Sequence, residues 1–207
     1  GVSFALALNQ EVASTETILT RARWRERQGF TLYTPRLTIR PMEERDAPRL
    51  AGMAVPEVAR NLSTIPAGMT VEDARAYIAN SRFQGVPGFR LAIEKSGQMI
   101  GGLGFGGTPL SVAYFLALEH WGQGLATEAL SAFLPAVFER SPVNRIAADH
   151  FTDNPASAGV LAKLGFFETG RDTGISKARL EPAPVITYAV TRESLKVPLR
   201  NSSISHA

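Results

Sequence analysis

The sequence predicts a mixed α/β sheet within a single domain, and three observations lead to this prediction. The chain has 207 residues, of which 44% are hydrophobic and 20% charged, a composition typical of a globular domain with a substantial core. Two apolar segments flank the turn at Ser96 and Gly97, as the strands of a β-hairpin do. After this hairpin, strand-like segments alternate with two segments of helical periodicity. Elements in this order form a sheet that helices cover.

The first half of the chain contains an extension, one strand and two helices. Residues 1–30 are expected to precede the domain as an extension, with a helix over 12–27. The domain begins with a strand over 35–41, where apolar and polar residues alternate. A short helix is predicted over 42–53. A second helix begins at Thr70, which an acidic residue follows three positions later, as in a capping box.

The second half of the chain alternates strands with helices. Its predicted elements are a hairpin over 89–105, a strand over 111–118, a helix from Leu125, a strand over 144–151, a helix over 154–165 and a strand over 184–190. The helix from Leu125 carries an apolar stripe that we expect to be buried, and Pro135 inside it is expected to kink or shorten it. The domain is therefore predicted to span 31–197, followed by a tail over 198–207.

Composition argues against several classes of function. The chain has no cysteine, which excludes disulfides, thiolate nucleophiles and cysteine-ligated metals and favours a cytoplasmic location. Its three histidines show no metal-ligand spacing, so no metal site is predicted. The net charge is only +3, and the arginines over 21–27 point to different sides of a helix, so a nucleic-acid-binding face is not expected. No apolar run approaches the length of a membrane span.

Two patterns look like known motifs but fail in their context. The stretch GLGFGG at 102–107 matches the dinucleotide fingerprint G-x-G-x-x-G, yet a strand-like segment follows where that fingerprint needs a helix. A hydrolytic triad can be written from Ser157, His150 and Asp149, but no nucleophile elbow surrounds the serine. Neither pattern is therefore taken as a site.

Two helix starts carry residues suited to ligand binding. Gly122 and Gly124 precede the helix from Leu125. Glycines there let the backbone approach a ligand, while the helix N-terminus offers N–H groups to a phosphate. Asn154 is placed to cap the next helix, whose apolar face includes the hydroxyl of Ser157. Capping alone would explain Asn154, and a hydrogen bond to nearby backbone would explain Ser157.

Taken together, these segments resemble a known family. The stretches YFLALEHWGQGLATEALSAFLPAVFE at 114–139 and NRIAADHFTDNPASAGVLAKLGF at 144–166 are closely similar to the GNAT acetyltransferase superfamily, in particular to the branch of the ribosomal-protein alanine N-acetyltransferases. The opening TPRLTIRPMEERDA at 34–47 resembles the usual start of that branch, and the resemblance covers about 32–195. It implies a GNAT-like mixed sheet with a splayed central strand pair and helices on both faces.

The resemblance also implies a binding site for acetyl-CoA. In the family, backbone N–H groups of a loop R/Q-x-x-G-x-G/A hold the diphosphate, and the backbone of the preceding strand pairs with the pantetheine arm. The implied cofactor-binding residues here are Leu116, Leu118, Gly122, Gln123, Gly124, Leu125, Ala126, Thr127 and Asn154. Trp121 departs from the family pattern, which has Arg or Gln at the first position of the loop.

For catalysis, the resemblance implies a proton donor and a proton acceptor. Many relatives have a general-acid tyrosine where this chain has Leu161, so Ser157, one turn earlier, is the expected donor. Asp149 matches a strand glutamate that some relatives use as a base, while a second family carboxylate appears here as Ser111. An ordinary strand carboxylate would equally explain Asp149, and a chain of water molecules is the alternative base.

The implied activity is acetyl transfer from acetyl-CoA to a primary amine. The acceptor is expected to enter opposite the cofactor, between 56–82 and the later loops, and a protein N-terminus or a small-molecule amine would both fit. Neither nucleic acid nor membrane is expected as a partner, and a homodimer stays open. A non-catalytic acyl-CoA-binding or regulatory module is the alternative, because the family tyrosine and strand glutamate are missing.

Overall fold

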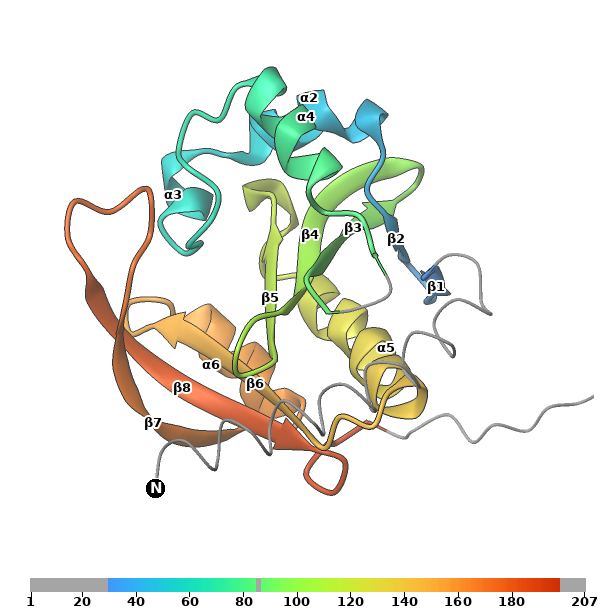
Figure 1. Ribbon diagram of the computed structural model, residues 1–207, viewed down its shortest axis with the longest axis vertical. Coiled ribbons are helices and arrows are strands. Elements are labelled where there is room, and N and C mark those ends of the chain that lie inside the picture. The colour runs from blue at the N-terminus through green and yellow to red at the C-terminus, as the bar shows by residue number, and fades with distance from the viewer. Residues whose placement is uncertain (1–29, 85–86, 198–207) are drawn as a thin grey trace, which may run out of the picture.

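The structure, a computed structural model, describes residues 30–84 and 87–197, which form one eight-stranded sheet with helices on both faces (Figure 1). The strands are β1 (Leu32–Tyr33), β2 (Thr38–Pro41), β3 (Phe89–Lys95), β4 (Gln98–Gly106), β5 (Ser111–Leu116), β6 (Arg145–Phe151), β7 (Phe167–Gly174) and β8 (Ala183–Thr191). The helices are η1 (Glu44–Asp46), α2 (Ala47–Met53), α3 (Pro56–Ala59), α4 (Val71–Ala79), η2 (Leu118–His120), α5 (Leu125–Arg140) and α6 (Pro155–Lys163). The expected helix over 12–27 and the tail over 198–207 lie outside the described residues.

The sheet consists of two antiparallel parts that meet at a single point. Strands β1 to β5 form one part in chain order, and β6, β8 and β7 form the other. They are joined by the parallel strands β5 and β6, which pair only where Ser111 meets Ala147. Here the N–H of Ala147 donates to the carbonyl of Leu110 at 2.8 Å. Beyond this point the two strands separate, which confirms the splayed central pair.

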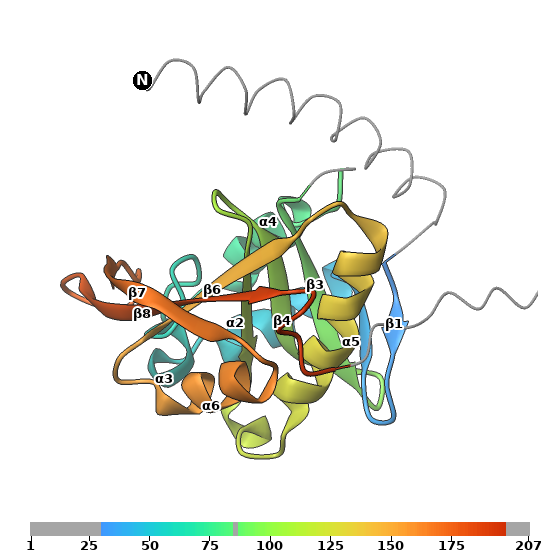
Figure 2. The same ribbon diagram turned by 90° about the horizontal axis from the view of Figure 1, so that it is seen from below.

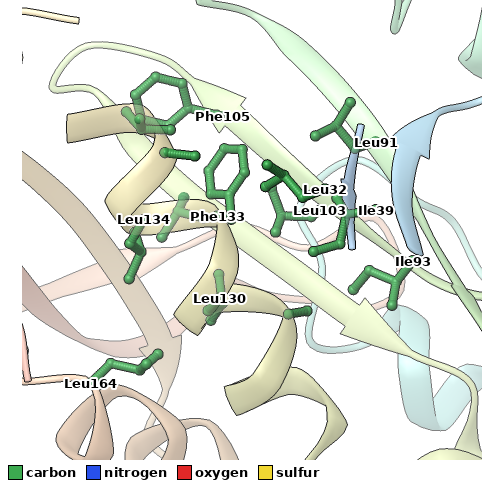
Figure 3. Close-up of a cluster of buried hydrophobic side chains, with 14 of the residues drawn as sticks. Leu32, Ile39, Leu91, Ile93, Leu103, Phe105, Leu130, Phe133, Leu134 and Leu164 are labelled. Atoms are coloured by element: carbon green, nitrogen blue, oxygen red, sulfur yellow. The ribbon is translucent and has the colours of Figure 1, made fainter. Parts of the chain in front are cut away.

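Helix α5 supplies much of the core on one face of the sheet. Its predicted apolar stripe is fully buried, and it consists of Leu130, Phe133, Leu134, Val137 and Phe138. Figure 3 shows Phe133 and Leu130 directed toward side chains of the strands, including Leu103 and Phe105. Helix α6 packs beside α5 on the same face (Figure 2). The starts of both helices therefore lie at the separation of β5 and β6.

Pro135 does not end helix α5. The helix continues through Pro135 to Arg140, so of the kink or shortening that was expected, the shortening does not occur. A proline inside a helix removes one backbone hydrogen bond, which is a local loss. Most of the helix from Ala129 to Phe138 is buried against the sheet, and this packing holds the helical turns on both sides of the proline.

Helices α2 and α4 cover the other face in a smaller core. Their buried side chains, such as Leu50 and Ile78, pack with Ala92 and Met99 of the sheet. The predicted capping box at Thr70 is confirmed. Its hydroxyl accepts from the N–H of the third helical residue at 3.1 Å, and that residue's carboxylate accepts from the N–H of Thr70 at 3.1 Å. The buried side chains of α4 hold this helix against the face opposite α5.

Strands β1 and β7 were not predicted from the sequence. Strand β1 has only two residues, and β7 is exposed along most of its length at the edge of the sheet. An edge strand with both faces open has no need for alternating apolar residues, so its sequence carries no strand pattern. Among the helices that the structure describes, none combines the length and hydrophobicity required for a bilayer span.

Candidate active site

The edge of β5 offers backbone groups to the space between β5 and β6. In an antiparallel pair, the N–H and the carbonyl of one residue point to the same side. The N–H of Ala117 donates to the carbonyl of Ile100 at the β4 side. The alternate residues Val112, Tyr114 and Leu116 therefore direct their backbone groups toward β6, from which β5 has separated. Such an edge can pair with an extended ligand that carries amide groups.

The end of β5 differs from the prediction. The strand ends at Leu116, and Leu118 lies in η2 with 40% of its surface exposed, so the expectation that Leu118 continues the strand is wrong. The indole of Trp121 donates to the carbonyl of Leu116 at 2.8 Å. Trp121 thus ties the start of the loop to the end of the strand, and the N–H of Leu116 remains as the group that faces β6.

A tight loop leads from η2 into α5. Gly122 and Gly124 have φ values of 72° and 74°, a left-handed conformation that favours glycine. Gly124 is the N-cap of α5, and no side chain among the described residues caps this 16-residue helix, so its first N–H groups stay available. A Cβ placed on Gly122 would meet no described residue within 4 Å, so open space lies beside this glycine. The loop therefore has the geometry of an anion site.

Arg36, far away in sequence, braces this loop. Its Nη1 donates to the carbonyl of Gln123 at 3.1 Å, and its Nε donates to Glu128 at 2.6 Å. Thr34 also donates to Glu128, at 2.6 Å. Burial tends to raise the pKa of Glu128, but the hydrogen bonds from Thr34 and Arg36 outweigh it and lower that pKa. This brace leaves no pattern in the sequence, because Arg36 and Glu128 lie 92 residues apart.

A central cavity of about 890 Å³ lies beside the open edge of β5. Its walls include the starts of α5 and α6, the segment over 61–65 and the end of β7. The predicted site residues that line it are Leu116, Gly122, Gly124, Leu125, Ala126, Thr127, Asp149, Asn154 and Ser157. Within the described part of the chain, Leu118 and Gln123 are outside the lining. The cavity thus brings the two helix starts together with the end of the sheet.

Ser157 and Tyr114 form a hydrogen-bonded pair at the cavity. The Ser157 Oγ lies 2.7 Å from the Tyr114 hydroxyl. Burial raises the pKa of Tyr114 to about 12, so the phenol keeps its proton at neutral pH and can donate to the serine. Leu161, which the resemblance aligned with a family tyrosine, is fully buried in the core. The sequence did not reveal this pair, because its two residues lie 43 positions apart. The one available signal was strand alternation, which puts Tyr114 on the side of β5 that α6 covers.

Asn154 caps α6, as predicted. Its Oδ1 accepts from the N–H of Ser157 at 3.3 Å. Its side-chain N–H₂ group has no hydrogen-bond partner within residues 30–84 and 87–197, and Asn154 lines the cavity. Capping therefore uses only the oxygen of this amide and leaves its donors for a ligand.

Asp149 and His150 lie on opposite faces of β6. Asp149 lines the cavity, where its carboxylate is open to solvent yet surrounded by protein on several sides. This partial burial raises the pKa of Asp149, and the negative charge of Asp172 on β7 adds to the rise, although His150 opposes it. The His150 ring is held by the Tyr188 hydroxyl at 3.2 Å and by the carbonyl of Phe151 at 2.8 Å. The hydrolytic triad written from the sequence is therefore not assembled.

Comparison with known proteins agrees with this geometry. Residues 36–167 match the acetyltransferase (GNAT) domain. The chain belongs to the GNAT acetyltransferase family. This GNAT acetyltransferase is similar to the uncharacterized N-acetyltransferase p20 of Bacillus licheniformis, which is 32% identical over 162 residues, or 72% of this chain and 90% of the relative.

Solved structures share the fold of this GNAT acetyltransferase. RimJ of Mycobacterium smegmatis, solved in complex with a CoA disulfide, has a TM-score of 0.69 at 23% identity and covers 81% of this chain and 88% of its own. RimL, a ribosomal alpha-N-protein acetyltransferase solved in complex with coenzyme A, has a TM-score of 0.67 at 20% identity. The match covers 76% of this chain and 95% of the RimL chain. At these identities the likeness is one of fold.

Proposed function

We propose that this GNAT acetyltransferase moves the acetyl group of acetyl-CoA directly to a primary amine. One observation carries the proposal. The open edge of β5 leads directly into the left-handed glycine loop at the start of α5. A ligand with amide groups along one part and a diphosphate at the other matches this order. Acetyl-CoA has both, and when bound it supplies the thioester whose acetyl group is transferred. The CoA complexes of RimJ and RimL support the same use of the fold here.

The proposed cofactor site is built almost entirely from main chain. The N–H groups of the loop and the first turn of α5 would bind the diphosphate, and they belong to Gly122, Gly124, Leu125, Ala126 and Thr127. The Leu125 side chain is fully buried in the core, so this residue can contribute only backbone. The N–H of Leu116 and the side-chain N–H₂ of Asn154 would orient the pantetheine arm. We omit Leu118 and Gln123, since neither lines the cavity.

The proton donor in this proposal is Ser157, with Tyr114 behind it. A hydroxyl that donates to the departing thiolate must have its hydrogen directed into the cavity. If the Tyr114 hydroxyl donates to the Ser157 Oγ across their 2.7 Å contact, the Ser157 hydrogen is released from that contact and can point to the thiolate. The raised pKa of Tyr114 keeps the phenol in its donating form. Tyr114 thus acts as a positioning residue.

The proton acceptor in this proposal is Asp149, acting on the amine directly or through water. An amine attacks only in its neutral form, and an α-amine with a pKa of about 7.7–8.0 needs little help to lose its proton. Because burial raises the pKa of Asp149, this carboxylate is a better base than an ordinary aspartate. It also lies on β6, directly across the opening from the edge of β5.

The amine acceptor is proposed to enter from the face opposite α5. The segment over 61–65 and the end of β7 line the cavity on this side, whereas the cofactor loop lines the other. A protein N-terminus is the first candidate, because RimL is a ribosomal alpha-N-protein acetyltransferase of the same fold. A small-molecule amine is the second candidate, since the open cavity sets no lower limit on acceptor size.

Thiol release from acetyl-CoA tests the proposal. The purified protein would be mixed with acetyl-CoA and a panel of short peptides, polyamines, amino acids and aminoglycosides, and the acetylated product would be identified by mass spectrometry. We expect thiol release that depends on one class of amine. Binding of CoA without thiol release from any amine would instead favour a non-catalytic acyl-CoA-binding module. A lower kcat in the Ser157→Ala variant, with unchanged affinity for CoA, would support Ser157 as the proton donor.

A further inference from the structure

We propose that the acceptor side of the central cavity is a charged trough that selects primary amines carrying an anionic group about three residues away. This inference rests on the proposed function and defines its acceptor class. The trough is a row of neighbouring residues on one face of the sheet, and it consists of Arg90, Gly104, Ala113, Asp149 and Thr187. All of them line the cavity.

The row follows from the register of the strands. Gly104 on β4 is opposite Ala113 on β5. Ser111 on β5 is opposite Ala147 on β6, so the residues two positions later, Ala113 and Asp149, are level with each other on the same face. The floor between the two ends is therefore made by a glycine and an alanine. Ala113 is exposed although it lies on a central strand, so the floor is open to a ligand.

Arg90 forms the positive end of the trough. It lies opposite Gly104, and its guanidinium sits over the ring of Tyr77, 4.6 Å from the centroid. No carboxylate pairs with Arg90 within the described residues. Glu94, four residues further along β3, is already bound by Arg40 at 2.6 Å. A guanidinium with unused donors in a cavity wall is suited to a carboxylate or a phosphate.

Asp149 forms the negative end of the trough, with Asp172 on β7 close enough to affect its charge. Neither carboxylate takes part in an ion pair in the part of the chain that the structure describes. Their negative charge attracts the amine while it is still protonated. This end also borders the opening between β5 and β6, where the proposed transfer takes place. The amine of the acceptor is thus directed to one end and its anion to the other.

The strand spacing sets the distance between the two groups of the acceptor. The amine would react at the open edge of β5, in the opening that Asp149 borders, so the distance to Arg90 is counted from β5. Neighbouring strands are about 4.8 Å apart, and the two steps from β5 to β3 therefore amount to roughly 10 Å. An extended peptide covers about 3.3–3.6 Å per residue, so its third residue would reach Arg90. A tripeptide with a free carboxylate, or a chain with an acidic third residue, has the required separation of charges.

A pair of peptides that differ only in charge tests this inference. Trialanine has its amine and its carboxylate at this separation, and trialanine amide lacks the negative charge. Arg90→Met removes the guanidinium charge and keeps an apolar side chain against Tyr77, whereas Arg90→Lys keeps a positive charge. Arg82→Met is the matched control, because Arg82 is exposed and outside the cavity lining. Melting temperatures would verify that each variant is folded.

We expect the parent protein to use trialanine with a kcat/KM about tenfold or more above that of the amide, mainly through KM. Arg90→Met should lose this preference, Arg90→Lys should keep part of it, and Arg82→Met should keep all of it. Equal use of the two peptides by the parent protein, or an intact preference in Arg90→Met, would overturn the inference.

The test separates this inference from the proposed function. Thiol release with any amine supports the proposed function, whichever peptide is preferred. If no amine is acetylated, the proposed function fails, and calorimetry with the CoA-loaded protein then decides the inference alone. Tighter binding of trialanine than of its amide would support the trough, whereas equal or absent binding would overturn it.

Discussion

The glycine loop before α5 offers a sharp test of the cofactor site. Gly122 and Gly124 both have left-handed φ values, of 72° and 74°. A Cβ at Gly122 would meet no atom within 4 Å, and a Cβ at Gly124 would only approach the Arg36 side chain at 3.8 Å. An alanine at either position is therefore strained by its backbone conformation and not by a clash. Gly122 lines the central cavity beside the proposed diphosphate position, so an added methyl would take up space there.

The expected magnitudes follow from these two effects. A non-glycine residue in the left-handed region costs about 1 kcal/mol. In a chain of this size, that cost lowers the melting temperature by roughly 2–4 °C. The methyl of Gly122→Ala also blocks close approach of the diphosphate to the backbone, so we expect CoA affinity to fall about tenfold or more, which corresponds to ~1.4 kcal/mol. The affinity for pantetheine, which lacks the diphosphate, should not change.

Calorimetric titration with CoA and with pantetheine measures both effects on the same variant. Gly52→Ala is the matched control, because Gly52 lies in α2 with nothing within 4 Å of its added Cβ. Glycine inside a helix is less favourable than alanine, so this control should be stabilised by about 0.5–1 kcal/mol and bind CoA normally. If Gly122→Ala lost stability but bound CoA like the parent, the loop would not be the diphosphate site.

Four further predictions concern the proposed catalytic groups and the core. Tyr114→Phe should lower kcat about tenfold or more while the KM for acetyl-CoA stays unchanged, because the phenol orients the proton donor; an unchanged kcat would remove it from the mechanism. Because the pKa of Asp149 is raised, the acidic limb of its kcat/KM profile should lie above the ordinary carboxyl value of about 3.9 and disappear in Asp149→Asn. The same raised pKa means that folding disfavours the charged form, so stability falls as pH rises from the ordinary value of about 3.9 up to the raised pKa and stays lower above it. Asp149→Asn should therefore melt higher than the parent at pH 7. Gly165→Ala should cost about 2 kcal/mol or more in urea unfolding, because its Cβ would overlap the carbonyl of Ser194 at a φ of 87°. Phe133→Ala should cost about 3–5 kcal/mol in the same assay, since Phe133 is fully buried, and a loss below 1 kcal/mol would contradict its place in the core.

The features predicted correctly from the sequence are those that neighbouring residues determine. The N-cap at Asn154, the capping box at Thr70 and the glycine turn before α5 each depend on a few consecutive residues, and each was recognised. The buried stripe of α5 was also recognised, because helical periodicity records which face packs on a sheet.

The features that were missed depend on contacts between distant parts of the chain. The brace from Arg36 to Gln123 and the pair of Tyr114 with Ser157 join residues 87 and 43 positions apart. Their side chains show no local pattern, so only the assembled sheet brings them to the cavity. Leu118 was placed in β5 because its apolar character continues that of the strand, yet the chain turns into η2 after Leu116.

Calorimetric titration of the purified protein with CoA tests the central claim most directly. That claim is that the open edge of β5 and the glycine loop of α5 together form a CoA site. It predicts saturable binding of one CoA per chain, with affinity that falls when the diphosphate is absent from the ligand. No detectable binding of CoA, or equal binding of CoA and pantetheine, would contradict it.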